Sequence, residues 1–263
     1  MAQTTGLKPP VLLIHGAFCG GWAFDAFRKP FEAAGHVCVA PNLRGHGADD
    51  PASAATGVSM ADFADDVAAL VRAQPSPPVL IGHSLGGLVA QMAAARAPVR
   101  ALILLAPSAP WGVQGGSLEE AVSAVSLYAL GPFWAQSIDP DYGLAARYSL
   151  DQMDKDARKA IFARMKPESG RALWETLNWW LDPFMTTSVA RDKVAAPVLA
   201  LAGEKDLIHP PATVRQTAER LGGKAKVMPG MSHWLLSEPG WETAANACLA
   251  WLAEEVALSA ARA

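Results

Sequence analysis

The chain has 263 residues, of which 51% are hydrophobic and 18% are charged, with a net charge of −3. This size suits one large domain, or a core with an inserted lid. The small net charge and the lack of a basic cluster argue against a nucleic-acid partner, and the longest apolar runs are too short to span a bilayer. The scattered cysteines indicate a reducing compartment, and residues 1–10 lack a signal-peptide pattern. We therefore expect a cytoplasmic protein, monomeric or homodimeric, that does not associate with membranes.

Buried apolar runs alternate with helical patterns in the first and last parts of the chain. The runs that predict strands are 10–15, 36–40, 79–81, 100–106, 197–202 and 225–228. The patterns that predict helices are 22–34, 59–74, the stretch after Ser84, 211–221 and 241–257. Ser59 is a candidate N-cap for the second helix, with Asp62 as its partner in the first turn. The alternation favours an α/β protein with a parallel sheet covered by helices on both faces.

The alternation stops between Pro107 and about Ala190. Three helical patterns occur here without a convincing strand, at about 117–130, 151–166 and 168–182. Five of the nine tryptophans also fall in this segment. We interpret residues 108–190 as a helical cap, or lid, that is inserted into a core formed by residues 1–107 and 191–263.

The stretch Pro78 to Gly87, PVLIGHSLGG, carries the strongest functional signal. It reads as a short strand, a sharp turn and the start of a helix, with Ser84 at the centre of a G-x-S-x-G pattern. A serine hydroxyl must be exposed, oriented and served by a base to act as a nucleophile. A strand-to-helix elbow exposes the serine, its glycines remove clashes, and the helix N-terminus favours developing negative charge.

Partners for Ser84 are expected directly after strands, because functional groups of parallel sheets collect at the carboxyl ends of the strands. Asp206 follows the strand at 197–202 in the turn GEKD, and His233 follows the last strand in the turn PGMSH. These residues would supply the acid and the base that a serine nucleophile needs. Asp182 and Asp192 are weaker alternatives for the acid, since neither clearly follows a core strand.

The chain order nucleophile, acid, histidine, with the segments GHSLGG, GEKD and PGMSH, resembles the α/β-hydrolase superfamily. The resemblance covers residues 10–107 and 195–257. It implies an α/β-hydrolase fold with about six strands, because two strands that commonly precede the first are absent. It also implies an oxyanion hole formed by the backbone N–H groups of Ala17 and Leu85. The segments HGAFCGGW and AGH, between residues 15 and 36, are further similar to small esterases related to plant methylesterases and hydroxynitrile lyases, and to bacterial carboxylesterases.

Three further histidines accompany these segments. His15 precedes the oxyanion turn and is expected to brace it by hydrogen bonding, while His83, beside the nucleophile, is expected to be structural. His46, in the segment RGHG, matches a loop that is frequent in the family and supports the floor of the active site. His, Asp and Cys residues show no metal-ligand spacing, and the chain has no phosphate loop or dinucleotide fingerprint. We predict neither a metal nor a cofactor.

The aromatic residues of the lid predict an apolar underside above Ser84, and substrate pockets are mostly apolar. Charged anchoring groups are sparse in this segment, so the expected substrate is a neutral, fairly hydrophobic ester or lactone. The residues expected to contribute to the acyl or alcohol pocket are Phe18, Trp111, Leu127, Phe133, Trp134, Trp179 and Trp234.

The favoured function is a carboxylic ester hydrolase, and several alternatives share the scaffold. Ser84 argues against haloalkane dehalogenases and epoxide hydrolases, most of which use an aspartate nucleophile. The apolar residues after His233 argue against a hydroxynitrile lyase, which needs a basic group there. A lactonase, a C–C bond hydrolase and a perhydrolase side activity stay open, because the same triad serves them. A non-enzymatic ligand receptor is less favoured, since its usual mark is a damaged triad, and only the site can decide between these functions.

Overall fold

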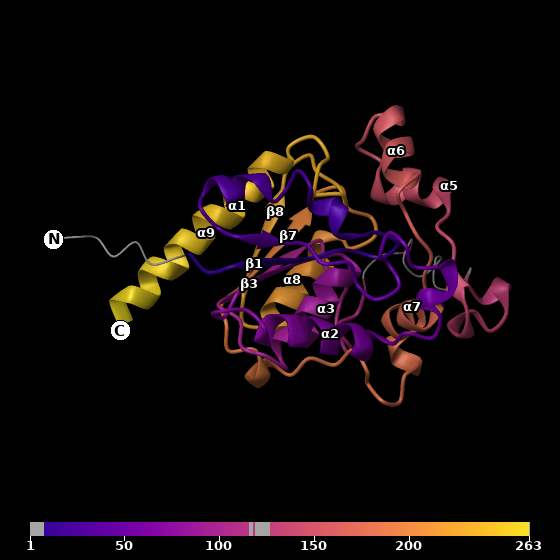
Figure 1. The fold of residues 1–263 in the computed structure, drawn as a ribbon, viewed down its shortest axis with the longest axis horizontal. Coiled ribbons are helices and arrows are strands. Elements are labelled where there is room, and N and C mark those ends of the chain that lie inside the picture. The colour runs from indigo at the N-terminus through magenta and orange to yellow at the C-terminus, as the bar shows by residue number, and fades with distance from the viewer. Residues whose placement is uncertain (1–7, 116–117, 119–126, 263) are drawn as a thin grey trace.

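The computed structural model describes residues 8–115, 118 and 127–262 of the chain. Six parallel strands form one sheet in the order β2-β1-β3-β4-β7-β8, with helices on either side of it (Figure 1). The strands are β1 (Val11–Ile14), β2 (Cys38–Val39), β3 (Val79–His83), β4 (Ala101–Leu105), β7 (Val198–Gly203) and β8 (Lys224–Met228). The predicted α/β class, with a parallel sheet of about six strands, is confirmed.

The helices beside the sheet lie close to their predicted positions, with one exception. The longer ones are α2 (Met60–Arg72), α3 (Leu85–Ala94), α8 (Pro211–Arg220) and α9 (Trp241–Arg262). The helix expected over 22–34 is instead divided into a 3-10 turn, η1 (Gly21–Phe24), and a short helix, α1 (Lys29–Ala33). Pro30 at the start of α1 explains the division, because its ring cannot follow a preceding helical turn. Two more 3-10 turns are η2 (Ala52–Ala55) and η7 (Arg191–Lys193).

The start of α2 is capped as its sequence predicts. The Ser59 side chain accepts a hydrogen bond from the Ala61 N–H, and the Asp62 carboxylate accepts one from the Ser59 N–H, both at 2.9 Å. These bonds satisfy amide groups that a helix N-terminus otherwise leaves without partners. Within the described part of the chain, no helix is both long enough and apolar enough to cross a bilayer.

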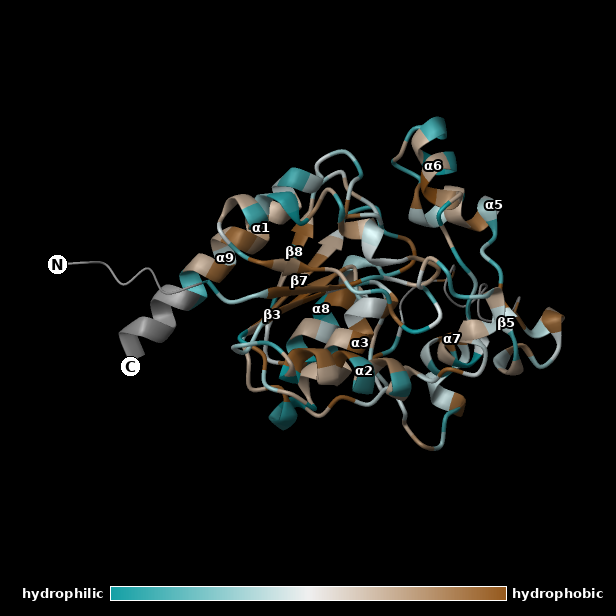
Figure 2. Ribbon diagram, in the orientation of Figure 1, coloured by the Kyte–Doolittle hydropathy of each residue, from teal (hydrophilic) through white to brown (hydrophobic). Residues whose placement is uncertain are grey.

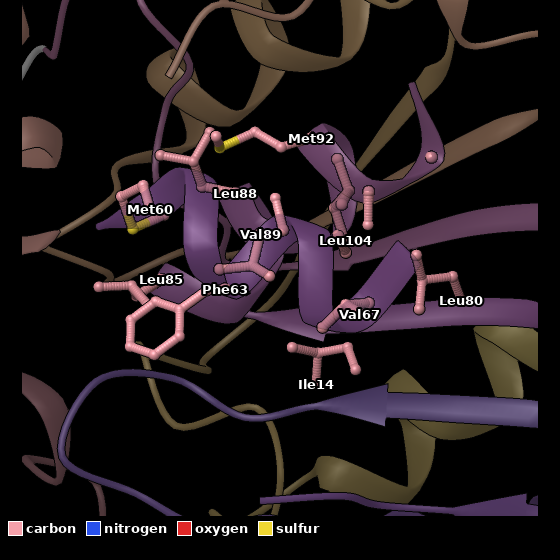
Figure 3. Close-up of a cluster of buried hydrophobic side chains, with 14 of the residues drawn as sticks. Ile14, Met60, Phe63, Val67, Leu80, Leu85, Leu88, Val89, Met92 and Leu104 are labelled. Carbon is pink, nitrogen blue, oxygen red and sulfur yellow. The ribbon is translucent and has the colours of Figure 1, made fainter. Parts of the chain in front are cut away.

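Two buried clusters, one on each face, hold the sheet between its helices. Successive strand residues point to opposite faces, so Leu12 and Leu80 join the cluster beneath α2 and α3, while Leu13 and Ile81 join the one beneath α1 and α9. The strands are accordingly the most apolar part of the ribbon in Figure 2. Figure 3 shows the first cluster, with labelled side chains from β1, β3, β4, α2 and α3. Burial on both faces explains why the four central strands β1, β3, β4 and β7 read as unbroken apolar runs.

Residues 108–190, which we call the lid segment, connect β4 to η7. Its described elements are η3 (Tyr128–Leu130), η4 (Phe133–Ala135), β5 (Ser137–Ile138), α5 (Tyr142–Leu144), a π-helical turn η5 (Ala145–Ser149), α6 (Lys155–Phe162), β6 (Glu168–Ser169), α7 (Gly170–Leu177) and η6 (Trp179–Leu181). Figure 1 shows α5, α6 and α7 at the end of the molecule opposite the C-terminal end of α9.

The predicted organisation of the lid segment is partly wrong. A two-stranded antiparallel sheet, β5 with β6, lies in a segment where no strand was expected. Each strand has only two residues, which is too short to leave an alternating pattern in the sequence. Helices α6 and α7 fall within the patterns at 151–166 and 168–182 but are shorter. Most of the pattern at 117–130 lies outside the described residues.

Glycines let the elbow around Ser84 approach β1 very closely. A Cβ atom added to Gly86 would overlap the carbonyl oxygens of Ile14 and His15, and one added to Gly82 would overlap the Gly86 carbonyl. Backbone atoms of a central strand and of a buried helix cannot move away cheaply. The first turn of α3 is therefore pressed against the end of β1, which only glycine permits.

Replacing Gly86 with alanine tests this close approach. We expect Gly86→Ala to lower the free energy of unfolding by about 3 kcal/mol, because backbone must shift to admit the methyl group. Urea unfolding followed by circular dichroism measures the change. Gly57→Ala is the matched control, since Gly57 has a positive φ of 73° but nothing within 4 Å of an added Cβ, and its loss is about 1 kcal/mol. Equal losses in the two variants would contradict the interpretation.

Candidate active site

Ser84 joins β3 to α3 in a strained backbone conformation. Its φ of 52° and ψ of −123° lie in a region that residues with a side chain rarely adopt. Its N–H donates to the Leu105 carbonyl of β4, and its carbonyl accepts from the Ser108 N–H, both at 3.0 Å. These bonds fix the strained residue on both sides. Ser84 is partly exposed between buried neighbours, so its hydroxyl is accessible at the carboxyl end of the sheet.

A chain of hydrogen bonds joins Ser84 to the two predicted partners. Nε2 of His233 lies 3.0 Å from the Ser84 Oγ, and Nδ1 of His233 lies 2.9 Å from the Asp206 Oδ2. The other Asp206 oxygen accepts from the N–H groups of Ile208 (2.8 Å) and His209 (2.9 Å). A carboxylate only accepts hydrogen bonds, so His233 carries its proton on Nδ1 and leaves Nε2 free for the serine hydroxyl. The arrangement is that of a nucleophile, a base and an acid.

The alternative acids lie elsewhere. The Asp182 carboxylate caps a turn of the lid segment, where it accepts from the N–H groups of Phe184 (2.9 Å) and Thr186 (2.7 Å). Asp192 is exposed in η7. Of the three aspartates considered, the structure places only Asp206 against His233.

The charges of the His233–Asp206 pair stabilise each other. Burial alone would lower the pKa of His233, but the charge of Asp206 and its hydrogen bond outweigh burial and raise that pKa above its ordinary value. Burial alone would raise the pKa of Asp206, yet His233 and a backbone donor hold it below its ordinary value. Asp206 therefore stays ionised at neutral pH, where it can orient and stabilise the imidazole.

His15 braces the turn that follows β1, as predicted. Its Nδ1–H donates to the Gly16 carbonyl, and its Nε2 accepts from the Leu43 N–H, both at 2.9 Å. Burial, with a smaller effect from His46, lowers the pKa of His15 to about 4, so the ring is neutral. Because a peptide unit is planar, holding the Gly16 carbonyl also fixes the direction of the Ala17 N–H on the same unit.

The turn Gly16–Cys19, which we call the oxyanion turn, lies directly against the elbow. A Cβ atom on Gly16 would lie 3.0 Å from the Ser84 Cβ. Leu85 is the first residue of α3, so its N–H has no carbonyl partner within the helix. The amides of Ala17 and Leu85 therefore belong to backbone beside Ser84, and their role as an oxyanion hole stays a prediction. Ala17, Ser84 and Leu85 line the same cavity.

Two other histidines support His233. Nε2–H of His83 donates to the His233 carbonyl at 2.9 Å, and burial, followed by the charge of His233, lowers the pKa of His83 to about 3. This neutral, buried ring has the structural role that the sequence predicts. His209, which sequence reasoning missed, lies with its ring centre 5.3 Å from that of His233, and its Nε2 lies 3.0 Å from the Ser108 Oγ. Its position three residues after Asp206, in the same turn, is the signal that could have found it.

A cavity of about 700 Å³ opens above Ser84 and His233. Among the predicted pocket residues, Phe18, Leu127 and Trp234 line it. Other apolar walls come from the lid segment and from the turn after β7, and include Ile138, Leu144, Tyr148, Met165, Leu173 and Ile208. Within the described residues, no three His, Cys, Asp or Glu side chains gather as metal ligands would.

The remaining predicted pocket residues pack elsewhere, and their assignment to the pocket is wrong. Trp111 and Trp179 stack edge to face on each other at 5.6 Å. Phe133 is completely buried, where it joins the core cluster beneath α2 and α3, and Trp134 is 43% exposed. Aromatic residues in the lid segment pair with one another or fill the core, so their number does not identify which of them reach the cavity.

Known proteins resemble this chain in sequence and in structure. Residues 11–245 match the Alpha/beta hydrolase family. Pimeloyl-(acyl-carrier protein) methyl ester esterase of Chromobacterium violaceum is 32% identical over 234 residues, which cover 83% of this chain and 84% of that protein. Methylesterase 3 of Arabidopsis thaliana is 34% identical over 88 residues, 33% of this chain and 34% of that protein. A thermophilic esterase from Thermogutta terrifontis has the same fold, with a TM-score of 0.70, 23% identity, and coverage of 95% of this chain and 92% of that one.

A parallel sheet with a serine elbow after β3 and a histidine after β8 defines an α/β-hydrolase architecture. The chain belongs to the Alpha/beta hydrolase family. The resemblance to small esterases and plant methylesterases is confirmed by the relatives found. The prediction of an ester-hydrolase type of enzyme is confirmed at this level of class.

Asp206→Asn tests the acid assignment through the pH profile. Asparagine lacks the negative charge that raises the pKa of His233. The low-pH limb of the plot of kcat/KM against pH should therefore move to lower pH, and kcat should fall by roughly 10⁴-fold. The wild type should lose activity as the pH falls through the raised pKa of His233, because only the neutral ring is a base. Ester hydrolysis from pH 5 to 9 measures both effects. Asp182→Asn is the control and should keep the wild-type limb; a shifted limb in that variant, or a flat wild-type profile, would refute the assignment.

Proposed function

We propose that this protein is a carboxylesterase that cleaves a neutral, fairly hydrophobic ester through an acyl-enzyme on Ser84. The observation that carries the proposal is the hydrogen-bond chain from Ser84 through His233 to Asp206, with distances of 3.0 and 2.9 Å. It lies beside a cavity large enough for a drug-sized molecule. The esterases among the relatives support the same reaction class.

The reaction proceeds in two halves. His233 Nε2 takes the proton of Ser84 while the serine Oγ attacks the ester carbonyl carbon. The N–H groups of Ala17 and Leu85 stabilise the resulting oxyanion. Collapse of this intermediate breaks the ester C–O bond, and His233 passes its proton to the leaving alcohol. His233 then takes a proton from water, which attacks the acyl carbon. Collapse of this second intermediate breaks the bond from the acyl carbon to the Ser84 Oγ, and His233 returns its proton to that oxygen as the acid leaves.

The described lining of the cavity favours a neutral substrate. It contains no Lys or Arg that could anchor a carboxylate, and it includes the acidic residues Asp139 and Asp141. An anionic acyl group would therefore meet like charge without a compensating partner. Lactones and activated C–C bonds suit the same triad, so they belong in the test panel.

The cellular location, the oligomeric state and the kind of binding partner remain predictions from the sequence. The expected substrate is a small hydrophobic ester or lactone that is free in solution, rather than a nucleic acid or a membrane component. The scattered cysteines favour a reducing, cytoplasmic environment. Size-exclusion chromatography with light scattering would distinguish the monomer from the homodimer.

Ser84→Ala tests the nucleophile. We expect this variant to lower kcat on p-nitrophenyl esters of graded chain length by roughly 10³-fold or more, as loss of a triad member does. Ser53→Ala, at an exposed position in η2, is the matched control and should retain wild-type rates. Wild-type turnover by Ser84→Ala would refute the proposal, and ligand binding without turnover by the wild type would favour the receptor alternative. Faster turnover of lactones would identify a lactonase, and faster turnover of a β-diketone would identify a C–C bond hydrolase.

The preference for neutral substrates is tested with a matched ester pair. We expect kcat/KM for p-nitrophenyl butyrate to exceed that for the p-nitrophenyl monoester of succinic acid by roughly tenfold or more, because Asp139 and Asp141 repel the free carboxylate. Added salt should narrow the gap, as should the double substitution Asp139→Asn and Asp141→Asn. Activity confined to the charged ester would contradict the proposed substrate class.

A further inference from the structure

A buried carboxylate of the lid segment contacts the oxyanion turn, and the reaction described above gives it no role. Glu168 lies in β6, directly before α7, and is fully buried. Its Oε2 accepts from the Phe18 N–H at 3.2 Å, and its Oε1 accepts from the Ser169 N–H at 2.7 Å. Burying a charge is costly unless the charge is paired. A carboxylate in this position therefore calls for an explanation beyond packing.

Each peptide unit of the oxyanion turn is held by a different partner. His15 holds the unit between Gly16 and Ala17 through the Gly16 carbonyl (2.9 Å). Glu168 holds the next unit through the Phe18 N–H. The Lys166 N–H donates to the Phe18 carbonyl at 2.9 Å and so holds the third. Two of the three restraints come from the lid segment.

The turn needs such restraints because its conformation is unfavourable. Phe18 has a φ of 63°, in the left-handed region that residues with a side chain seldom occupy. Such residues persist only where their surroundings over-determine them. If the bond from Phe18 to Glu168 were lost, the turn could relax, and the Ala17 N–H on the adjacent unit would be held by the His15 bond alone.

His46 lies against the carboxylate. Its Nε2 lies 3.2 Å from the Glu168 Oε2 without the alignment of a hydrogen bond, and its Nδ1–H donates to the Arg44 carbonyl at 3.2 Å. Burial, and to a smaller extent Lys166, would lower the pKa of His46, but the charge of Glu168 outweighs them and raises it. Protonation of the ring would therefore offset the negative charge of Glu168 beside the oxyanion turn, a charge that would disfavour an oxyanion.

We propose that Glu168, paired with His46, is a positioning residue that holds the oxyanion turn in its active conformation through the Phe18 N–H. The lid segment thereby contributes to transition-state stabilisation as well as to the walls of the cavity. This inference rests on the proposed function, since it assumes that the Ala17 N–H stabilises an oxyanion.

Glu168→Gln tests the inference. Phe18 and Ser169 donate to different oxygens of Glu168, and a carboxamide in the same position turns an NH2 group toward one of them. We expect kcat on p-nitrophenyl butyrate to fall about 10- to 100-fold, part of the loss that follows removal of an oxyanion donor, while KM changes less than threefold. The inhibition constant of an alkyl boronic acid, whose serine adduct mimics the tetrahedral intermediate, should rise in the same proportion. We expect Glu168→Ala to lower kcat at least as much. A wild-type kcat in either variant would overturn the inference.

Glu175→Gln is the matched control. Glu175 is also a buried carboxylate of the lid segment, and it accepts from the Met60 N–H of the core at 2.7 Å, away from the oxyanion turn. We expect a similar loss of thermal stability but a kcat within about threefold of the wild type. Equal losses of kcat in the two Gln variants would mean that Glu168 only docks the lid segment, and would overturn the inference. Ser84-dependent turnover by the wild type in the same assay separates this outcome from failure of the proposed function.

Discussion

The close approach of α3 to the end of β1 is the constraint on which the site depends. Gly86 lets the first turn of the helix rest on the carbonyl groups of Ile14 and His15, and this contact brings two distant segments of the chain together. Helix α3 begins with Leu85, and the chain after β1 continues to Ala17, so the N–H groups of both residues lie near this contact. Ser84 must take a strained conformation to connect strand to helix across so short a distance. The proposed nucleophile and both proposed donors thus follow from one backbone contact.

Carboxylates decide the charge of the buried histidines around this contact. His15, His83 and His209 have no carboxylate within hydrogen-bonding distance of their rings among the described residues, and burial, reinforced by a neighbouring histidine, lowers their pKa values to about 4, 3 and 3. His46 and His233 each face a buried carboxylate, which raises their pKa values instead. Neutral rings can accept as well as donate; His15 and His83 brace backbone, and His209 contacts the Ser108 hydroxyl. The His46–Glu168 pair lies beside the oxyanion turn, and the His233–Asp206 pair lies beside the Ser84 hydroxyl.

The sequence predicted the parts of the site that follow core strands. Ser84, Asp206 and His233 were found because buried apolar runs identify strands, and a parallel sheet gathers the residues after them. The pocket was predicted less well, because no repeating geometry relates the lid segment to the sheet. Trp111 and Trp179 pack on each other. Composition does not reveal which aromatic residues pair in this way and which reach the cavity. Glu168 was not predicted from the sequence, because β6 is too short to show a pattern and because Phe18, which donates to Glu168, lies 150 residues away along the chain.

The lid segment links substrate selection to catalysis at one short stretch of chain. Met165 lines the cavity, the Lys166 N–H holds the Phe18 carbonyl, and Glu168 holds the Phe18 N–H. Phe18 itself lines the cavity, so a substrate that fits against it would also contact the turn that we propose stabilises the oxyanion. Substitutions of the cavity-lining residues Phe18 or Met165 should therefore change kcat together with KM, because small displacements of a preorganised donor are costly. Substitutions in the part of the cavity lined by Leu144 and Tyr148, on neighbouring turns of the lid segment, have no such link to the turn and can alter specificity alone.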